Sequence, residues 1–241
     1  MSLLLISDLH LQPTRPDISS GLYRLLQNFP ADCKQLYILG DLFEYWIGDD
    51  APLPGSDQLA ESLKKLHQGG VGIFFQAGNR DFLVGQDWLA VAGIKCLPEA
   101  FKLRFPDGTY TLLMHGDQLC TDDHEYQAFR QTVRDPAWQS MFLNKTIEER
   151  IAIAENLRNE SQMRGAEKSE AIMDVNQETV EEVMRNTNVT RLIHGHTHRP
   201  AIHQLSVNNQ PAERIVLGDW DKKGWYIHAT PSSNELISFS L

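Results

Sequence analysis

The chain has 241 residues, of which 41% are hydrophobic and 22% are charged, and its formal net charge is -10. This composition is ordinary for a globular protein with a substantial core, and the negative charge argues against a broad electrostatic grip on nucleic acid. The first residues lack the basic start of a signal peptide, and no stretch approaches the ~20 apolar residues that span a bilayer. We therefore expect a cytoplasmic protein, or one held only at a membrane surface.

Five short apolar runs in the sequence end abruptly in polar residues, and this pattern predicts buried strands. Helical patterns lie between several of them, for example at residues 21–29 and 59–67, and the alternation predicts an α/β domain. In open α/β sheets, ligands bind beyond the carboxyl ends of the strands, where each of these polar clusters lies. After Arg214 the pattern alternates well enough for two or three closing strands. The five predicted strands are residues 3–6, 36–39, 71–77, 111–114 and 191–193.

The region from residue 121 to residue 188 breaks this rhythm and predicts a helical insertion over the strand ends. Thr146 and Glu149 have the spacing of a capping box at a helix start. Apolar residues then recur on one helical face, and a second helical stretch follows. We therefore expect a core of residues 1–120 and 189–241 and an insertion of residues 121–188. The first face consists of Ile147, Ile151, Ala154 and Leu157, and the inward residues of the second stretch are Val180, Val183 and Met184.

An apolar cluster lies within the insertion and has two interpretations. It is either a small satellite core or an apolar surface that faces a lipid or a membrane. The residue types suit both, so the sequence leaves the choice open. The cluster consists of Trp138, Met141, Phe142 and Leu143.

The polar residues at the strand ends have the character of metal ligands. They supply carboxylate, imidazole and amide donors without a thiolate, a set that suits Mn²⁺, Fe²⁺ or similar ions better than a structural zinc site. Asp8 and His10 alternate by two at a strand end, so both can point the same way, and His196 and His198 repeat this spacing. The two oxygens of Asp41 can bridge neighbouring metal ions that clamp a phosphate. The candidate ligands are Asp8, His10, Asp41, Asn79, His115, His196 and His198.

These ligands stand in five motifs with a fixed order. The motifs are Asp8-x-His10, Gly40-Asp41, Gly78-Asn79-x-Asp81, His115-Gly116-Asp117 and Gly195-His196-Thr197-His198. In order and spacing they resemble the motifs of the calcineurin-like metallophosphoesterases. The resemblance covers most of the chain and implies an α/β sandwich of two β-sheets flanked by helices, here with a helical insertion, and a dinuclear metal site.

The resemblance also implies a role for each motif position. Asp8, His10 and His198 would hold the first metal ion, Asn79, His115 and His196 the second, and Asp41 would bridge the two. His194 precedes the last motif, and we expect it to be a supporting or structural histidine. The implied catalytic residues are Asp41, Asn79, Arg80 and His115.

One position departs from the general family pattern. Many members have a histidine after the Gly-Asn of the third motif, and it helps the leaving oxygen depart; here the residue is Arg80. An arginine releases no proton at neutral pH, but its planar fork donates hydrogen bonds to phosphate oxygens. An alkoxide leaving group needs a proton, whereas a phosphate leaves as a stable anion, so we infer a phosphoanhydride substrate. The alternative is that another residue supplies the proton.

Longer segments have a narrower resemblance, to the bacterial branch of this family that hydrolyses UDP-2,3-diacylglucosamine in lipid A biosynthesis. It implies water attack on the α-phosphorus, with two Mn²⁺ ions, to give UMP and 2,3-diacylglucosamine 1-phosphate (lipid X). It further implies peripheral attachment to the cytoplasmic side of the inner membrane, and an insertion that acts as a lid for the acyl chains. The alternative is a metallophosphoesterase that acts on another nucleotide diphosphate or on a phosphodiester. The matching segments are residues 38–50, 78–83, 115–123 and 171–176.

The substrate contacts of that branch carry over to matching positions in this chain. One position departs: where some relatives have an asparagine, this chain has Gly165, so the backbone or the nearby Arg164 would substitute. Arg150, Arg158 and Arg164 pair either with phosphates or with glutamates on a solvated helix face, and the sequence leaves both readings open. It assigns no role to His124. The carried-over contacts are Asn79, Arg80, Asp123, Ser161, Lys168 and His196.

Overall fold

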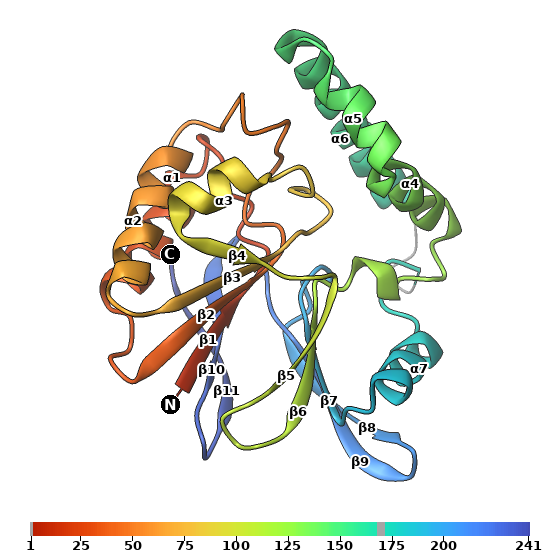
Figure 1. Ribbon diagram of the computed structural model, residues 1–241. Coiled ribbons are helices and arrows are strands. Elements are labelled where there is room, and N and C mark those ends of the chain that lie inside the picture. The colour runs from red at the N-terminus through yellow and green to blue at the C-terminus, as the bar shows by residue number, and fades with distance from the viewer. Residues whose placement is uncertain (1, 168–171) are drawn as a thin grey trace.

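Two β-sheets lie face to face, and helices cover their outer sides (Figure 1). The computed structural model describes residues 2–167 and 172–241, without the side chains of residues 159–167. The first sheet has the strand order β11 (Asn234–Ser240), β10 (Lys223–Ala229), β1 (Ser2–Ile6), β2 (Cys33–Leu39), β3 (Gly72–Gln76) and β4 (Ile94–Cys96). The second has the order β5 (Ala100–Arg104), β6 (Tyr110–Met114), β7 (Arg191–His194), β9 (Gln210–Val216) and β8 (Ala201–Val207). The predicted two-sheet α/β architecture is confirmed.

Strand β1 shows how the layers are built. It lies inside the first sheet, parallel to β2 and antiparallel to β10, and all five of its residues are buried. Because side chains alternate along a strand, Leu3 and Leu5 pack between the two sheets, whereas Leu4 and Ile6 pack under the helices. A strand buried on both faces has a continuous apolar sequence, as this one does.

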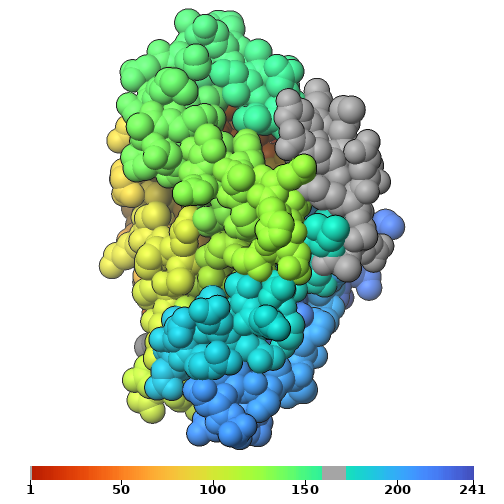
Figure 2. Space-filling model, turned by 90° about the vertical axis from the view of Figure 1, so that its right-hand side faces the viewer, coloured from red at the N-terminus to blue at the C-terminus, as the bar shows by residue number. Residues whose placement is uncertain are grey.

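Helices α1 (Pro16–Gln27), α2 (Ser56–Gln68) and α3 (Gln86–Ala92) cover the first sheet. Helix α7 (Gln177–Thr187) packs against the second sheet, as the cyan and blue surfaces of Figure 2 show. Val180 and Met184 of α7 are fully buried beside Leu112 and Leu192. Their predicted inward orientation is confirmed, and α7 covers a sheet face rather than the strand ends.

The remaining helices, α4 (His124–Arg134), α5 (Pro136–Leu143) and α6 (Ile147–Glu167), rise above the strand ends after a 3-10 turn at Asp117–Leu119 (Figure 1). The capping box at the start of α6 is confirmed. Thr146 N donates to Glu149 Oε2 at 3.0 Å, and Glu149 N donates to Thr146 Oγ1 at 3.3 Å. These two bonds satisfy amide groups that a helix start leaves without partners.

The apolar cluster of α5 divides into an inner and an outer half. Phe142 is buried and stacks on Trp138, with 5.2 Å between ring centroids and 14° between planes. Met141 and Leu143 are 55% and 41% exposed. The predicted satellite core is therefore not a separate one: Phe142 belongs to the core cluster under the first sheet and Trp138 packs against that cluster, whereas the other two residues are exposed.

The predicted strands appear in the structure as β1, β2, β3, β6 and β7. Two strands, β10 and β11, follow Arg214, as expected. Within residues 2–167 and 172–241, no helix has both the length and the apolar character that crossing a membrane requires.

Candidate metal centre

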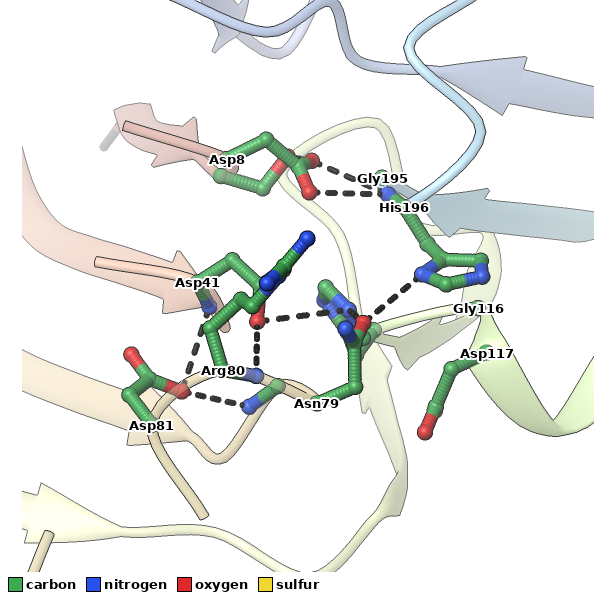
Figure 3. A network of polar contacts seen from close by, with 12 residues as sticks. Asp8, Asp41, Asn79, Arg80, Asp81, Gly116, Asp117, Gly195 and His196 are labelled. Carbon is green, nitrogen blue, oxygen red and sulfur yellow. Dashed lines mark hydrogen bonds and ion pairs between the residues drawn. The ribbon is translucent and has the colours of Figure 1, made fainter. Parts of the chain in front are cut away.

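The loops that follow β1, β2 and β7 meet at one edge between the sheets (Figure 3). Asp8 N donates to Gly40 O at 3.1 Å, and His10 N donates to Asp41 O at 2.9 Å, so the first two loops run side by side. Both carboxylate oxygens of Asp8 accept from the backbone N of His196, at 3.1 and 3.0 Å. The strand ends thereby bring together ligand candidates from both ends of the sequence.

Five of the seven predicted ligands have a left-handed backbone. Their φ angles lie between 51° and 64°, a region that residues other than glycine seldom adopt and that is common at functional sites. Asp8 and His10 do point to one place, as predicted, but the reason differs. Strand β1 ends at Ile6, so these left-handed turns aim the two side chains, rather than strand alternation. The five residues are Asp8, His10, Asp41, His196 and His198.

The first predicted ligand group is assembled. The ligand atoms of Asp8, His10 and His198 all lie within 4.8 Å of one another. The Nε2 atoms of the two histidines are 3.3 Å apart, and Nε2 of His198 lies 3.5 Å from Oδ1 of Asp8. Oδ2 of Asp41 lies 3.9 Å from Nε2 of His10, so the predicted bridging carboxylate borders this group.

The second predicted group is assembled beside the first. His115 Nδ1 donates to Leu39 O at 2.8 Å, so a neutral ring presents an unprotonated Nε2 to the site. This Nε2 faces two acceptors, Asn79 Oδ1 at 2.9 Å and Asp41 Oδ1 at 3.7 Å. His196 Nδ1 lies 2.8 Å from the same Asn79 oxygen. In the tautomer that leaves Nδ1 of His196 unprotonated as well, lone pairs of both rings and of Asn79 face one another, and this arrangement fits a bound cation.

The carboxylates draw positive charge into both groups. Burial alone would lower the pKa of His198, but the hydrogen bond and charge of Asp8, with other nearby carboxylates, raise it to about 9. The charges of Asp41 and Asp8 likewise raise the pKa of His115 against the effect of burial. The nitrogen and oxygen donors therefore fit two divalent cations, with one oxygen of Asp41 facing each group.

A buried carboxylate to which the sequence assigned no role ties two ligand loops together (Figure 3). Asp81 accepts from the backbone N–H groups of Gly78 at 2.8 Å, Leu42 at 2.7 Å and Asp41 at 3.2 Å. Burial and the charge of Asp41 raise the pKa of Asp81 to about 7, and these donors offset part of the rise. The sequence signal that could have indicated this role is the position of Asp81 as the last residue of the third motif.

Glu44 is a second supporting residue to which the sequence assigned no role. Its Oε2 lies 3.1 Å from His10 Nδ1, on the opposite side of the ring from Nε2, which faces His198. A carboxylate in this position fixes the orientation of a ligating histidine. Its Oε1 lies 3.9 Å from Arg158 of α6, so the carboxylate also connects the insertion to the site.

Two glycines let the ligand loops approach one another closely. A Cβ on Gly78 would lie 2.1 Å from Asp41 Oδ1, and a Cβ on Gly195 would lie 2.0 Å from Asp8 Oδ2. Real Cβ contacts are essentially never shorter than 3.0 Å, so both positions exclude a side chain unless a ligand carboxylate moves.

His194 lies behind the ligands and is completely buried. Its Nδ1 donates to Gly195 O at 2.8 Å, and its Nε2 accepts from Arg214 Nη1 at 3.1 Å. Burial, together with the charge of Arg214, lowers the pKa of His194 to about 3, so the ring stays neutral. It steadies the turn that carries His196.

A cavity of about 500 Å³ extends from the metal centre to the insertion. Of the predicted substrate contacts, Asn79, Arg80, Asp123 and His196 line it. The side chains of Ser161 and Arg164 lie outside the described part of the chain, and Lys168 lies outside it altogether. Gly165 has no side chain, and only its backbone, within α6, is described. The apolar wall consists of Tyr45, Trp46, Ile47, Phe82, Leu83, Phe129, Trp138, Phe142, Ile151, Ala154 and Leu157.

Arg150 follows neither reading that the sequence left open. Its guanidinium is buried and donates to Asp50 Oδ1 at 2.7 Å and to Ile47 O at 2.6 Å, and a second nitrogen reaches Asp50 Oδ2. It therefore fastens α6 to the loop after β2. Arg158, in contrast, lines the cavity.

Comparison with known proteins agrees with this geometry. Curated relatives named UDP-2,3-diacylglucosamine hydrolase are 48% identical in Salmonella arizonae and 46% identical in Cellvibrio japonicus, over 100% of this chain and of each relative. The relative of the same name from Chromohalobacter salexigens is 47% identical over 94% of this chain and 92% of its own. A solved archaeal phosphodiesterase, 12% identical, superposes over 100% of both chains with a TM-score of 0.50 and shares the fold. Residues 1–200 match the model of the calcineurin-like phosphoesterases, and the chain belongs to this family.

Proposed function

We propose that the chain hydrolyses the pyrophosphate bond of UDP-2,3-diacylglucosamine by water attack on the α-phosphorus, giving UMP and 2,3-diacylglucosamine 1-phosphate. The observation that carries the proposal is a single cavity that joins the metal-ligand groups to a long apolar wall. A nucleotide diphosphate sugar with two acyl chains has the same division between a charged and an apolar part. The names of relatives 46–48% identical to the chain support the same substrate.

We propose two Mn²⁺ ions as the resident cations, one in each ligand group. The donor set of carboxylate, imidazole and amide groups supports this choice over a thiolate-bound zinc site. Two bound divalent ions would supply charge to the phosphate oxygens and lower the pKa of an attacking water.

The chain's own residues position the reacting phosphate. Arg80 N donates to Asp41 Oδ1 at 2.8 Å, which holds the start of the Arg80 side chain beside the bridging carboxylate at the polar end of the cavity. From there its guanidinium can donate two hydrogen bonds to the diphosphate as negative charge develops on it. The leaving sugar phosphate departs as an anion, so the step requires no proton from Arg80.

We propose that α4 to α6 form a lid over the acyl chains and that its outer edge rests on the cytoplasmic side of the inner membrane. Four apolar side chains of this edge are 40% to 55% exposed. One of them, Ile151, also lines the cavity, so the exposed edge and the apolar wall adjoin. The four residues are Met141, Leu143, Ile147 and Ile151.

The test measures UMP release by metal-stripped protein, with and without added Mn²⁺, in water enriched with heavy oxygen. UDP-2,3-diacylglucosamine is compared with unacylated UDP-N-acetylglucosamine. We expect Mn²⁺-dependent turnover of the lipid alone, with the label in UMP. Equal turnover of both substrates would replace the proposal with a soluble nucleotide diphosphate as substrate. Label in the sugar phosphate would refute attack on the α-phosphorus.

A matched pair of variants separates charge from geometry at Arg80. Arg80→Lys keeps the charge but loses the planar fork, and Arg80→Gln loses both. We expect both variants to bind Mn²⁺ normally, with kcat falling more in Arg80→Gln. Unchanged kcat in both would refute the role of Arg80 at the diphosphate.

A further inference from the structure

Helix α4 directs one face toward the loops of the second ligand group. Tyr126, Arg130 and Arg134 are spaced four residues apart, so their side chains follow one another along a single side of the helix. They reach the loops that carry Asn79, His115 and His196, which are the second ligand group.

Tyr126 contacts this group at two points. Its ring lies on the ring of His196, with 5.8 Å between centroids and 29° between planes. Its hydroxyl donates to Asp117 Oδ2 at 3.0 Å, two residues after the ligand His115. The stacked ring limits rotation of His196 about the bond that aims Nδ1 at Asn79 Oδ1.

Arg130 shares that buried carboxylate with Tyr126. Its Nε donates to Asp117 Oδ2 at 2.7 Å, and its Nη2 lies 2.8 Å from Glu99 Oε1. Asp117 is only 1% exposed, so its charge depends on these partners for stabilisation. The turn that follows His115 is therefore anchored to α4.

Arg134 reaches the third loop through backbone groups. Its Nη2 donates to Gly78 O at 2.9 Å and to Ala77 O at 3.3 Å, immediately before the ligand Asn79. Its guanidinium also lies over the ring of Phe82, 5.3 Å from the centroid. Arg134 therefore contacts this loop both before and after Asn79. The Arg134 side chain therefore stabilises the turn that carries Asn79.

We propose that α4 is part of the frame of the metal centre, and that Tyr126 and Arg134 are positioning residues for the second cation. The inference rests on the dinuclear part of the proposed function and not on the identity of the substrate. The predicted insertion then has two roles: α4 holds the metal loops, and α5 and α6 contribute side chains to the apolar wall of the cavity. No contact of these side chains with a substrate is needed.

The test counts Mn²⁺ ions bound to metal-stripped protein, and uses electron paramagnetic resonance to distinguish a coupled Mn²⁺ pair from a single ion. The variants are Arg134→Gln, the conservative Arg134→Lys and Tyr126→Phe. Arg185→Gln is the matched control, because Arg185 is an exposed arginine of α7. No substrate enters the assay, so its outcome is independent of the reaction.

In Arg134→Gln we expect the first ion to bind as in the parent chain and the second about tenfold or more weakly, with loss of the coupled signal. Arg134→Lys should recover part of the second affinity, and Tyr126→Phe should weaken it less. The proposal is overturned if both ions bind normally, or if both weaken equally. Should Arg134→Gln fail to fold, the same criteria apply to Arg134→Lys and Tyr126→Phe. A parent chain that binds fewer than two ions would refute the dinuclear centre itself.

Discussion

Replacing Gly195 by alanine should disable the first ligand group through one methyl carbon. The added Cβ would lie 2.0 Å from Asp8 Oδ2 and 2.3 Å from Ser7 Oγ, where contacts below 3.0 Å are essentially never seen. Asp8 is completely buried and bonded through both oxygens to His196 N, so it cannot turn toward solvent. It must shift by about 1 Å, and a displacement of that size can cost about 100-fold in rate.

The predicted outcome is therefore weaker binding of the first Mn²⁺ and a fall of about 100-fold in kcat/KM, equivalent to about 2.7 kcal/mol of transition-state stabilisation. Calorimetric titration of metal-stripped protein measures the affinity, and UMP release measures kcat/KM. Gly70→Ala is the control, because Gly70 has a φ of +94° and open space around its Cβ position. It should cost stability but leave metal affinity unchanged. Parent-like affinity and turnover in Gly195→Ala would refute the steric reasoning.

Three further tests concern the ion pair of α6, the charge of a ligand histidine and the apolar wall of the cavity. Asp50→Ala leaves the buried charge of Arg150 without its partner, so we expect a loss of about 2–3 kcal/mol in unfolding free energy. Arg150→Met should cost less, because the exposed Asp50 returns to water. Urea denaturation measures the stability of both variants, and a larger loss in Arg150→Met would contradict the proposed role of this ion pair. At about pH 7.5, metal-free His198 is protonated because its pKa is about 9, whereas a ligating imidazole is not. Mn²⁺ binding should therefore release about one proton or more and weaken as pH falls. Calorimetry in buffers of different ionisation enthalpy counts these protons, and zero release would be the adverse result. Trp138→Ala should lower kcat/KM about 10-fold to 100-fold for the diacylated substrate, since it removes an aromatic side chain from the apolar wall. Parent-like kcat/KM for this substrate would argue against the acyl role.

The ligand candidates could be predicted because their local signals are strong. Each follows a short apolar run, and the topology of an α/β sheet places such strand ends along one edge. Asp8 and His10 were found in this way, although the left-handed turns that aim them leave no mark in an apolar pattern. Backbone conformation at non-glycine residues depends on the surrounding contacts, and the pattern does not contain them.

The connections between distant segments could not be predicted. Arg150 and Asp50 are 100 positions apart, and each alone is an ordinary charged residue on a surface pattern. Helical periodicity placed Ile147 and Ile151 on an apolar face, yet both are 40% exposed, because periodicity reports that a face is apolar and not what covers it. The same limit applies to α7, whose buried face was predicted without the sheet it packs on.

The position of β1 has a consequence for the order of events during synthesis. His10 and His198, which face each other in the first ligand group, are separated by 188 positions. At about 5–20 residues per second, a ribosome needs roughly 10–40 s to go from one to the other. Throughout that interval β1 also lacks its neighbour β10, which lies later still in the chain. Until then the nascent protein carries an exposed strand edge and an incomplete first ligand group, so affinity for the first cation arises only after His198 has been synthesised.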